Sequence, residues 1–200
     1  MRRALLGVAA LLLLGLTACT SGGPGAPADT GAPTGPRCIE RVAEPSPSVS
    51  ASASGPALPA MALPCFDGGR YINLADLGGR PAVVNLWASW CRPCLTELPE
   101  VNRFAADGAG KLLVVGVVTK DRHDQAKSVI EDLKLTFPML EDQGQQLAIA
   151  ASAALSQGLF SLPVTLFITP SGTIAYAYHG DPLTSARLKE LTRQYLGVSL

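Results

Sequence analysis

The stretch VVNLWASWCRPCLTELPE, residues 83–100, decides how this chain folds. Its start belongs to the nearly continuous apolar run Pro81–Ala88, which is typical of a strand buried on both faces. After that run, apolar residues recur at helical spacing and predict an amphipathic helix over residues 94–106. The pair Cys91 and Cys94 lies at the junction. The sequence therefore places two cysteines where a buried strand ends and a helix begins.

Strands and helices alternate along the rest of the chain. A Pro-Ser-Gly turn at residues 170–172 separates two of the strand-length runs and predicts an antiparallel hairpin. The alternation predicts the α/β class, with a central mixed sheet that has a parallel core and an antiparallel edge pair, flanked by helices. The further strands are expected at Lys111–Val118, Val164–Ile168 and Thr173–Tyr178, and the further helices at Asp124–Leu135, around Gln145–Leu155, and at Thr184–Leu196.

The composition excludes several classes of protein. Of 200 residues, 48% are hydrophobic and 16% are charged, which excludes a wholly disordered chain. Lys and Arg number 16 and balance 16 Asp and Glu without any basic block, so nucleic acid is not an expected partner. The long apolar run Ala4–Leu16 is shorter than the roughly 20 residues that a membrane-spanning helix needs. No transmembrane span is expected.

The N-terminus has the parts of a secretory signal in their usual order. Arg2 and Arg3 precede the apolar run, and small residues follow it. The run ends in LTAC, residues 16–19, which resembles the lipobox of bacterial lipoproteins, where the cysteine receives diacylglycerol after cleavage. The resemblance implies a signal peptide over residues 1–18 and a lipidated Cys19, hence an extracytoplasmic protein anchored to the cell membrane. An ordinary signal peptide with an incidental cysteine is the alternative.

The residues after the expected cleavage site predict a flexible linker over residues 19–57. Between Thr20 and Ala57, 29 of 38 residues are Gly, Pro, Ala, Ser or Thr, which leaves too little apolar surface to offset the entropy of ordering. Only RCIERVAE, residues 37–44, has an ordinary composition. We therefore expect one folded domain over residues 58–200.

A Cys-x-x-Cys pair at the start of a helix suits thiol–disulfide exchange. Two intervening residues let the sulfurs of Cys91 and Cys94 meet, while the unpaired N–H groups of the first turn favour a thiolate at Cys91. Arg92 adds a positive charge, and Pro93, which lacks an N–H, suits a first helical turn. The thiolate is the species that attacks a disulfide.

A Cys-x-x-Cys pair can also belong to a zinc site or to an inert structural disulfide. Half of a zinc site would need a second Cys-x-x-Cys or a close pair of histidines, and the sequence has neither. An inert structural disulfide would gain little stability from so short a loop. Redox chemistry remains the favoured interpretation.

The motif resembles the active-site segment of TlpA/ResA-like thioredoxin-fold proteins, whose pattern is WCxPCxxExP. The match runs over residues 90–99. Further on, FSLPVTLFITPSGTI, residues 160–174, resembles the family's cis-proline strand, turn and closing strand, and residues 121–140 fit its extra helix–strand insertion. The resemblance covers residues 58–200 and implies a thioredoxin fold and a thiol-disulfide oxidoreductase.

By the same resemblance, Cys91 is the nucleophile, Cys94 resolves the mixed disulfide, and Pro163 is the cis-proline that presents backbone groups to a substrate. Trp90 and Pro93 are supporting residues of the motif. The implied function is reduction of disulfides in exported proteins, with electrons from a membrane partner and with no cofactor or metal. A disulfide-forming oxidase and a redoxin-type binding or metallochaperone module remain alternatives.

One departure concerns acid groups near the cysteines. Thioredoxins carry a buried aspartate six residues before the first cysteine, and here that position is Asn85. The nearest acid is Glu97, about one helical turn from Cys94. The resemblance implies that Glu97 modulates the acidity of the cysteines, and a solvated surface glutamate is the alternative.

The remaining cysteines and histidines support weaker expectations. Two leftover cysteines in an oxidising compartment, Cys38 and Cys65, are expected to pair, with free thiols or an intermolecular link as the alternative. His123 is expected in a solvent-exposed loop. The family resemblance implies that His179, at the end of the last strand, lies near the rim of the active site.

Overall fold

The structure is a computed structural model, and it describes residues 38–39, 55–77 and 79–200. The expected signal peptide, Cys19 and most of the expected linker lie outside these residues. Within the described part of the chain, no helix is both long and apolar enough to cross a membrane.

The core is a five-stranded mixed sheet with the strand order β5-β4-β3-β6-β7. β3, β4 and β5 run parallel, whereas β6 and β7 are antiparallel to their neighbours. β3 and β4 are buried at every position, as their continuous apolar sequences predict. The strands span Ala82–Trp87 (β3), Leu113–Thr119 (β4), Met139–Asp142 (β5), Val164–Ile168 (β6) and Ile174–His179 (β7).

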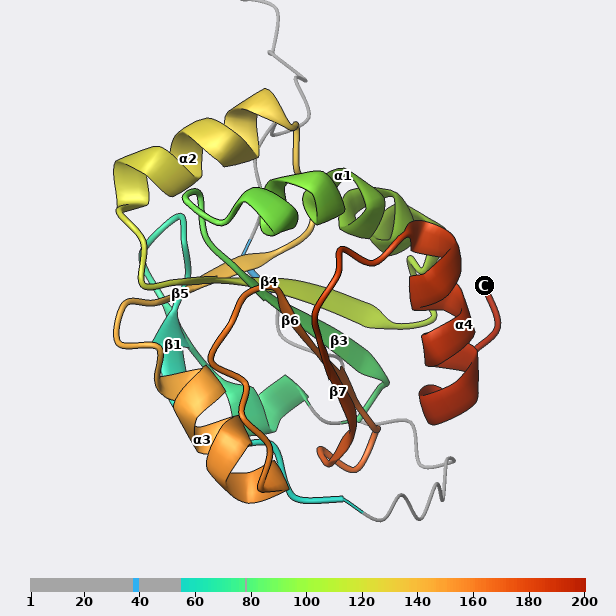
Figure 1. The fold of residues 1–200 in the computed structure, drawn as a ribbon. Coiled ribbons are helices and arrows are strands. Elements are labelled where there is room, and N and C mark those ends of the chain that lie inside the picture. Colours follow the sequence, from blue (N-terminus) through green and yellow to red (C-terminus); the bar gives the residue numbers. More distant parts are fainter. Residues whose placement is uncertain (1–37, 40–54, 78) are drawn as a thin grey trace, which may run out of the picture. The chain divides into compact units, whose positions relative to one another are not determined.

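Helices cover both faces of this sheet (Figure 1). α1, α2 and α4 pack on the face that contains Val83 and Trp87, and α3 packs on the opposite face, which contains Val84 and Leu86. The α/β class and the mixed sheet predicted from the sequence are therefore confirmed. The helices span Arg92–Asp107 (α1), His123–Asp132 (α2), Gln146–Leu155 (α3) and Ser185–Leu196 (α4).

The predicted end of the second helix is wrong by three residues. α2 ends at Asp132, because Lys134 adopts a φ of 51° and turns the chain out of the helical path. Leu135, the predicted last residue, is 1% exposed and packs in the core beyond the helix. The amphipathic pattern continues past the helix because the residue that follows the turn is a buried leucine.

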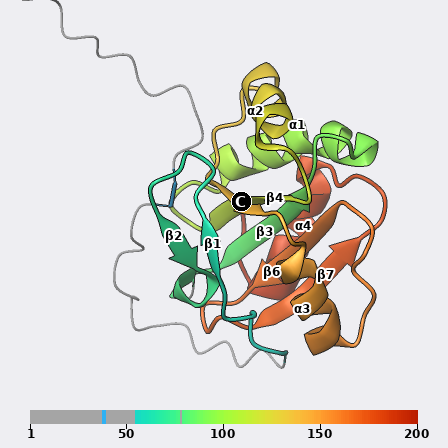
Figure 2. The same ribbon diagram turned by 90° about the vertical axis from the view of Figure 1, so that its left-hand side faces the viewer.

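The sequence did not predict a short hairpin whose two strands lie side by side in Figure 2 and whose first strand lies beside β5 in Figure 1. β1 (Ala62–Pro64) pairs antiparallel with β2 (Tyr71–Asn73), and a 3₁₀ helix, Leu74–Leu77, follows. The hairpin is joined to the main sheet at its turn. Cys65 forms an isolated antiparallel β-bridge with Leu140, and the Phe66 N–H donates to the Met139 carbonyl at 3.0 Å.

The start of the described domain is fixed at the opposite edge of the sheet. The Ile174 N–H donates to the Pro56 carbonyl at 2.8 Å, and the Leu58 N–H donates to the Gly172 carbonyl at 2.8 Å. These bonds tie the chain to β7 before it reaches β1.

Candidate active site

Cys91 and Cys94 form a disulfide at the N-terminus of α1, with their Cα atoms 5.2 Å apart. Cys91 is the N-cap residue, and its Sγ accepts the backbone N–H of Cys94 at 3.2 Å. Pro93 lies in the first turn, where a missing N–H does no harm. The sulfur of Cys91 thus occupies the position from which a helix N-terminus stabilises an anion.

Both cysteines are buried. Cys91 is 5% exposed in the disulfide form, and Cys94 is 1% exposed. The cause is packing, since both cysteines belong to the apolar cluster between α1 and the sheet. Leu162, which precedes Pro163, packs against the same cluster.

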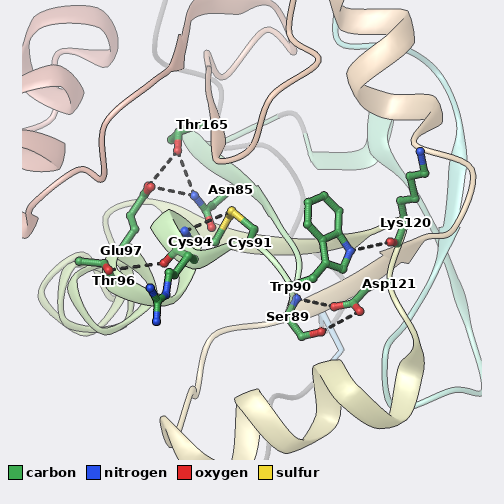
Figure 3. Close-up of a disulfide and its surroundings, with 11 residues drawn as sticks. Asn85, Ser89, Trp90, Cys91, Cys94, Thr96, Glu97, Lys120, Asp121 and Thr165 are labelled. Atoms are coloured by element: carbon green, nitrogen blue, oxygen red, sulfur yellow. Dashed lines mark hydrogen bonds between the residues drawn. A yellow bond between two sulfur atoms is a disulfide. The ribbon is translucent and has the colours of Figure 1, made fainter.

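Glu97 lies in a buried hydrogen-bonded group with Asn85 and Thr165 (Figure 3). Asn85 Nδ2 donates to Glu97 Oε1 at 3.1 Å and to Thr165 Oγ1 at 3.0 Å, and the Thr165 hydroxyl lies 3.4 Å from the same carboxylate oxygen. Glu97 is 1% exposed, so it is not the solvated surface residue that the sequence left open. Burial raises its pKa to about 7, although its hydrogen bonds act in the opposite direction.

Pro163 follows a cis peptide bond from Leu162 and directly precedes β6. β6 is the neighbour of β3, and Thr165 faces Asn85 across this pair. The strand that begins with the cis-proline region therefore supplies the third member of the Glu97 group. Sequence reasoning missed Thr165, because its position two residues after Pro163 was the only signal.

Trp90 is the exposed aromatic residue beside the disulfide. Trp90 is 59% exposed, and its indole N–H donates to the Lys120 carbonyl at 2.9 Å. A hollow of about 330 Å³ lies next to it. The hollow is lined otherwise by polar and charged residues: Lys120, Asp121, Arg122, Gln125 and Gln143.

A larger cavity, of about 1520 Å³, lies between the β1–β2 hairpin and α2, and neither Cys91 nor Cys94 lines it. His123 is part of its wall, where the ring stacks on Phe66 with centroids 4.3 Å apart and Nδ1 lies 2.6 Å from Glu141 Oε1. His123 is exposed, as expected, but it is the first residue of α2 rather than a loop residue. His179 ends β7 and is exposed, opposite Val164 of β6.

Cys38 and Cys65 form the second disulfide among the described residues, with Cα atoms 5.5 Å apart. Cys38 is 7% exposed and Cys65 is 2% exposed, and Arg70 Nη2 donates to the Ile39 carbonyl at 2.9 Å. With Asp67, the two sulfurs bring potential metal ligands within 4.8 Å, but the disulfide occupies both sulfurs.

Comparison with known proteins identifies a family and several relatives of this chain. The profile of the AhpC/TSA family matches residues 55–177. The thiol:disulfide interchange protein DsbE of Pseudomonas fluorescens is 32% identical over 63% of this chain and 66% of its own. The sporulation thiol-disulfide oxidoreductase A of Bacillus subtilis is 30% identical over 70% of this chain and 82% of its own.

A solved structure shows the same fold. The thioredoxin-family thiol:disulfide interchange protein of Chlorobium tepidum superposes with a TM-score of 0.63 at 22% identity, over 74% of this chain and all of its own. ResA of Bacillus thuringiensis is a further relative, 26% identical over 64% of this chain and 68% of its own. The resemblance to TlpA/ResA-like proteins and the thioredoxin fold are confirmed, and the chain belongs to the AhpC/TSA family.

Proposed function

We propose that this protein is an extracytoplasmic thiol-disulfide oxidoreductase that reduces disulfides in exported proteins and is held at the membrane through Cys19. The observation that carries the proposal is the Cys91–Cys94 disulfide at the N-terminus of α1, with a buried carboxylate one turn further along the helix. Relatives named as thiol-disulfide oxidoreductases support it.

The proposed reaction is a pair of thiol–disulfide exchanges. The Cys91 thiolate attacks one sulfur of a client disulfide, so that a mixed disulfide forms and the other client sulfur leaves as a thiolate. The Cys94 thiolate then attacks Cys91 Sγ, which closes the Cys91–Cys94 disulfide and releases the second client sulfur. The client gains two electrons and two protons, and the oxidoreductase is left oxidised. A dithiol donor must reduce it again, and we assign this role to a membrane partner.

Glu97 favours the reductive direction. A negative charge near the cysteines disfavours a thiolate, and a stabilised reduced form is what makes a dithiol protein an oxidant. Because the pKa of Glu97 is about 7, about half of this group is ionised at neutral pH. The reduced pair is then less stabilised than in an oxidase, and electrons pass more readily to the client.

The surface around the pair suits a protein client. The cysteines do not line the larger cavity, and the hollow beside Trp90 is only about 330 Å³. This volume is at the lower end of the roughly 300–1,000 Å³ of small-molecule pockets, and because the exposed Trp90 forms part of its lining, a small molecule would be only partly enclosed there. An extended chain could lie across the exposed Trp90 and reach the disulfide.

The function is tested by insulin reduction with purified protein and a small dithiol as electron source. Wild type should accelerate the reaction, and Cys91→Ser should abolish the acceleration. Cys94→Ser should instead accumulate a mixed disulfide, visible on a non-reducing gel, because the resolving thiolate is gone. Cys38→Ser is the matched control and should keep the activity. Full activity of Cys91→Ser would refute the assignment of the nucleophile.

The direction is tested by the midpoint potential of the Cys91–Cys94 couple. A reductase should equilibrate with glutathione buffers at a potential more negative than about −200 mV. A value near that of a strong oxidant, about −120 mV, would favour the oxidase instead.

A further inference from the structure

Three hydrogen bonds join the two residues before Cys91 to the turn that follows β4. The carboxylate of Asp121 accepts the backbone N–H of Ser89 and also, at 2.8 Å, its hydroxyl. The indole N–H of Trp90 donates to the neighbouring Lys120 carbonyl at 2.9 Å. Figure 3 shows Lys120 and Asp121 side by side, facing Trp90 and Ser89.

The sheet places these segments together. β3 and β4 are parallel neighbours with Trp87 opposite Val118, so the residues that follow both strands leave the same edge of the sheet. Asp121 is 6% exposed, and the backbone N–H of Arg122 gives its carboxylate a third hydrogen bond at 2.8 Å. A buried carboxylate is costly unless its oxygens are hydrogen-bonded, and here two of the three donors belong to Ser89.

The turn also has an uncommon backbone. Lys120 adopts a φ of 49°, in the left-handed region that non-glycine residues rarely occupy and that is often found at functional sites. The carbonyl that receives the Trp90 indole belongs to this residue. Lys120 and Asp121, in the turn after β4, thus bind Trp90 and Ser89, which follow β3.

The position of the Cys91 sulfur depends on the two residues before it, Ser89 and Trp90. The Cys91 N–H donates to the Ala88 carbonyl at 3.1 Å, and Cys91 Sγ accepts the Cys94 N–H at 3.2 Å. Ser89 lies inside the turn that these residues close, and both of its hydrogen-bond donors go to Asp121. A displaced Ser89 would carry the Cys91 sulfur away from the N–H group that stabilises its thiolate.

We propose that Asp121 is a positioning residue for the reactive cysteine: its carboxylate fixes Ser89 so that the Cys91 sulfur stays at the N-terminus of α1. The inference rests on the proposed dithiol–disulfide function. A direct electrostatic effect of the Asp121 charge would have the opposite sign, because a nearby anion disfavours a thiolate. Loss of positioning lowers the thiolate reactivity of Cys91, whereas loss of charge alone raises it.

The test measures alkylation of Cys91 in the fully reduced mature chain, by iodoacetamide across about pH 5–9, with mass mapping to separate Cys91 from the other cysteines. Asp121→Asn removes the charge and turns an amide donor toward the donors of Ser89. Ser89→Ala removes one hydrogen bond and keeps the charge, so it carries the test if Asp121→Asn does not fold.

Asp142→Asn is the matched control. Asp142 is also buried, at 3% exposure, and its carboxylate accepts the N–H groups of Gln146 and Leu147 at 2.9 Å each, at the start of α3. The variant should lower the thermal unfolding midpoint without changing the alkylation of Cys91. It therefore separates a general loss of stability from a loss of position.

At pH 7 the alkylation rate should fall about threefold or more in Asp121→Asn and by a smaller factor in Ser89→Ala, in line with weakened hydrogen bonds. A faster rate in Asp121→Asn would overturn the proposal in favour of a charge effect. Unchanged rates in both variants, with only a lower unfolding midpoint, would overturn it in favour of a merely structural role. Insulin reduction by wild type tests the proposed function alone, so the two can fail separately.

Discussion

Among single residues, Asn85 and Glu97 show how this site obtains a carboxylate that β3 does not supply. The strand position six residues before Cys91 is an amide, and it donates to an acid that comes from α1. Glu97 therefore lies one helical turn beyond Cys94 on the same element as the cysteines. Because burial raises its pKa to about 7, its charge changes within the physiological pH range.

Glu97→Gln should change how stability depends on pH. The folded-state pKa of about 7 lies above the usual 4.5, so the stability contributed by the neutral acid is complete below pH 4.5 and is lost as pH rises through about 7. Gln keeps an acceptor for Asn85 and cannot ionise. Between about pH 5 and 8, the free energy of unfolding of wild type should fall relative to the variant, by up to about 3 kcal/mol. Urea unfolding measures the difference.

Glu131→Gln, on the exposed side of α2, makes the same chemical change at the surface and is the control. Its curve should run parallel to that of wild type. Parallel curves for wild type and Glu97→Gln would show that Glu97 does not titrate as a buried acid.

The same Glu97→Gln variant should also make the cysteine thiolates easier to form. Removal of the negative charge favours the thiolate, so the thiolate ultraviolet absorbance of the reduced protein should appear at lower pH. The midpoint potential should become less negative, and release of the mixed disulfide should slow if Glu97 accepts the proton of Cys94. Titration curves that superimpose, with unchanged turnover, would leave Glu97 without a role in the chemistry.

Among the elements, those with strong local signals could be predicted from the sequence. β6 was predicted at Val164–Ile168 and is found there, because its β-branched and aromatic residues form a run of strand length that ends in a Pro-Ser-Gly turn. β1 and β2 were not predicted, because strands of three residues show no period. The hairpin depends on pairing with β5 and on a disulfide to Cys38, both of which are distant in sequence.

The residues of the site also fall into a group that the sequence predicts and a group that it does not. The cysteines and Glu97 share one helix, so their spacing alone was informative. Thr165 is 68 residues from Glu97, and Asp121 is 32 residues from Ser89. Only the neighbouring positions of β6, β3 and β4 in the sheet bring those partners together, and a single sequence does not specify such pairings.

Removal of the Cys38–Cys65 disulfide should destabilise the domain without affecting its chemistry. The sequence separation of 27 closes a long loop, for which the chain-entropy model gives about 3–4 kcal/mol. The double variant Cys38→Ser, Cys65→Ser should lose about that much free energy of unfolding in urea. It should still reduce insulin at a temperature where it is folded.

The control is wild type under the same oxidising conditions, with a thiol assay to verify that its second disulfide is formed. An unchanged urea midpoint in the double variant would contradict a stabilising role for this disulfide.

For the whole molecule, the redox pair and the start of the domain lie in different places on the sheet. The cysteines follow β3 at the carboxyl end of the parallel strands, where α/β sheets commonly hold their functional groups. The chain before β1 is fixed at β7, and Cys38 is fixed at the hairpin beside β5. The covalent attachment of the N-terminal segment is thus separate from the active site.

Cys19→Ala should release the protein from the membrane. Without the cysteine that follows the predicted cleavage site, the chain should carry no label from a radioactive fatty acid and should leave the detergent phase in a phase-partition experiment. Cys38→Ala, which changes the next cysteine along the chain, should remain labelled. Labelling that persists in Cys19→Ala would rule out lipidation at this position.

If Cys19 is the anchor, the Cys38–Cys65 disulfide also sets how far the domain can travel from the bilayer. With the disulfide closed, Cys38 is the first fixed point of the domain, and the 19 steps from Cys19 span at most about 65 Å when fully extended. If the open disulfide also frees Cys38 and Ile39 from the core and from the hydrogen bond to Arg70, the first fixed point becomes Pro56 and the limit rises to about 130 Å. Release of this two-residue contact would then double the radius within which the domain can move.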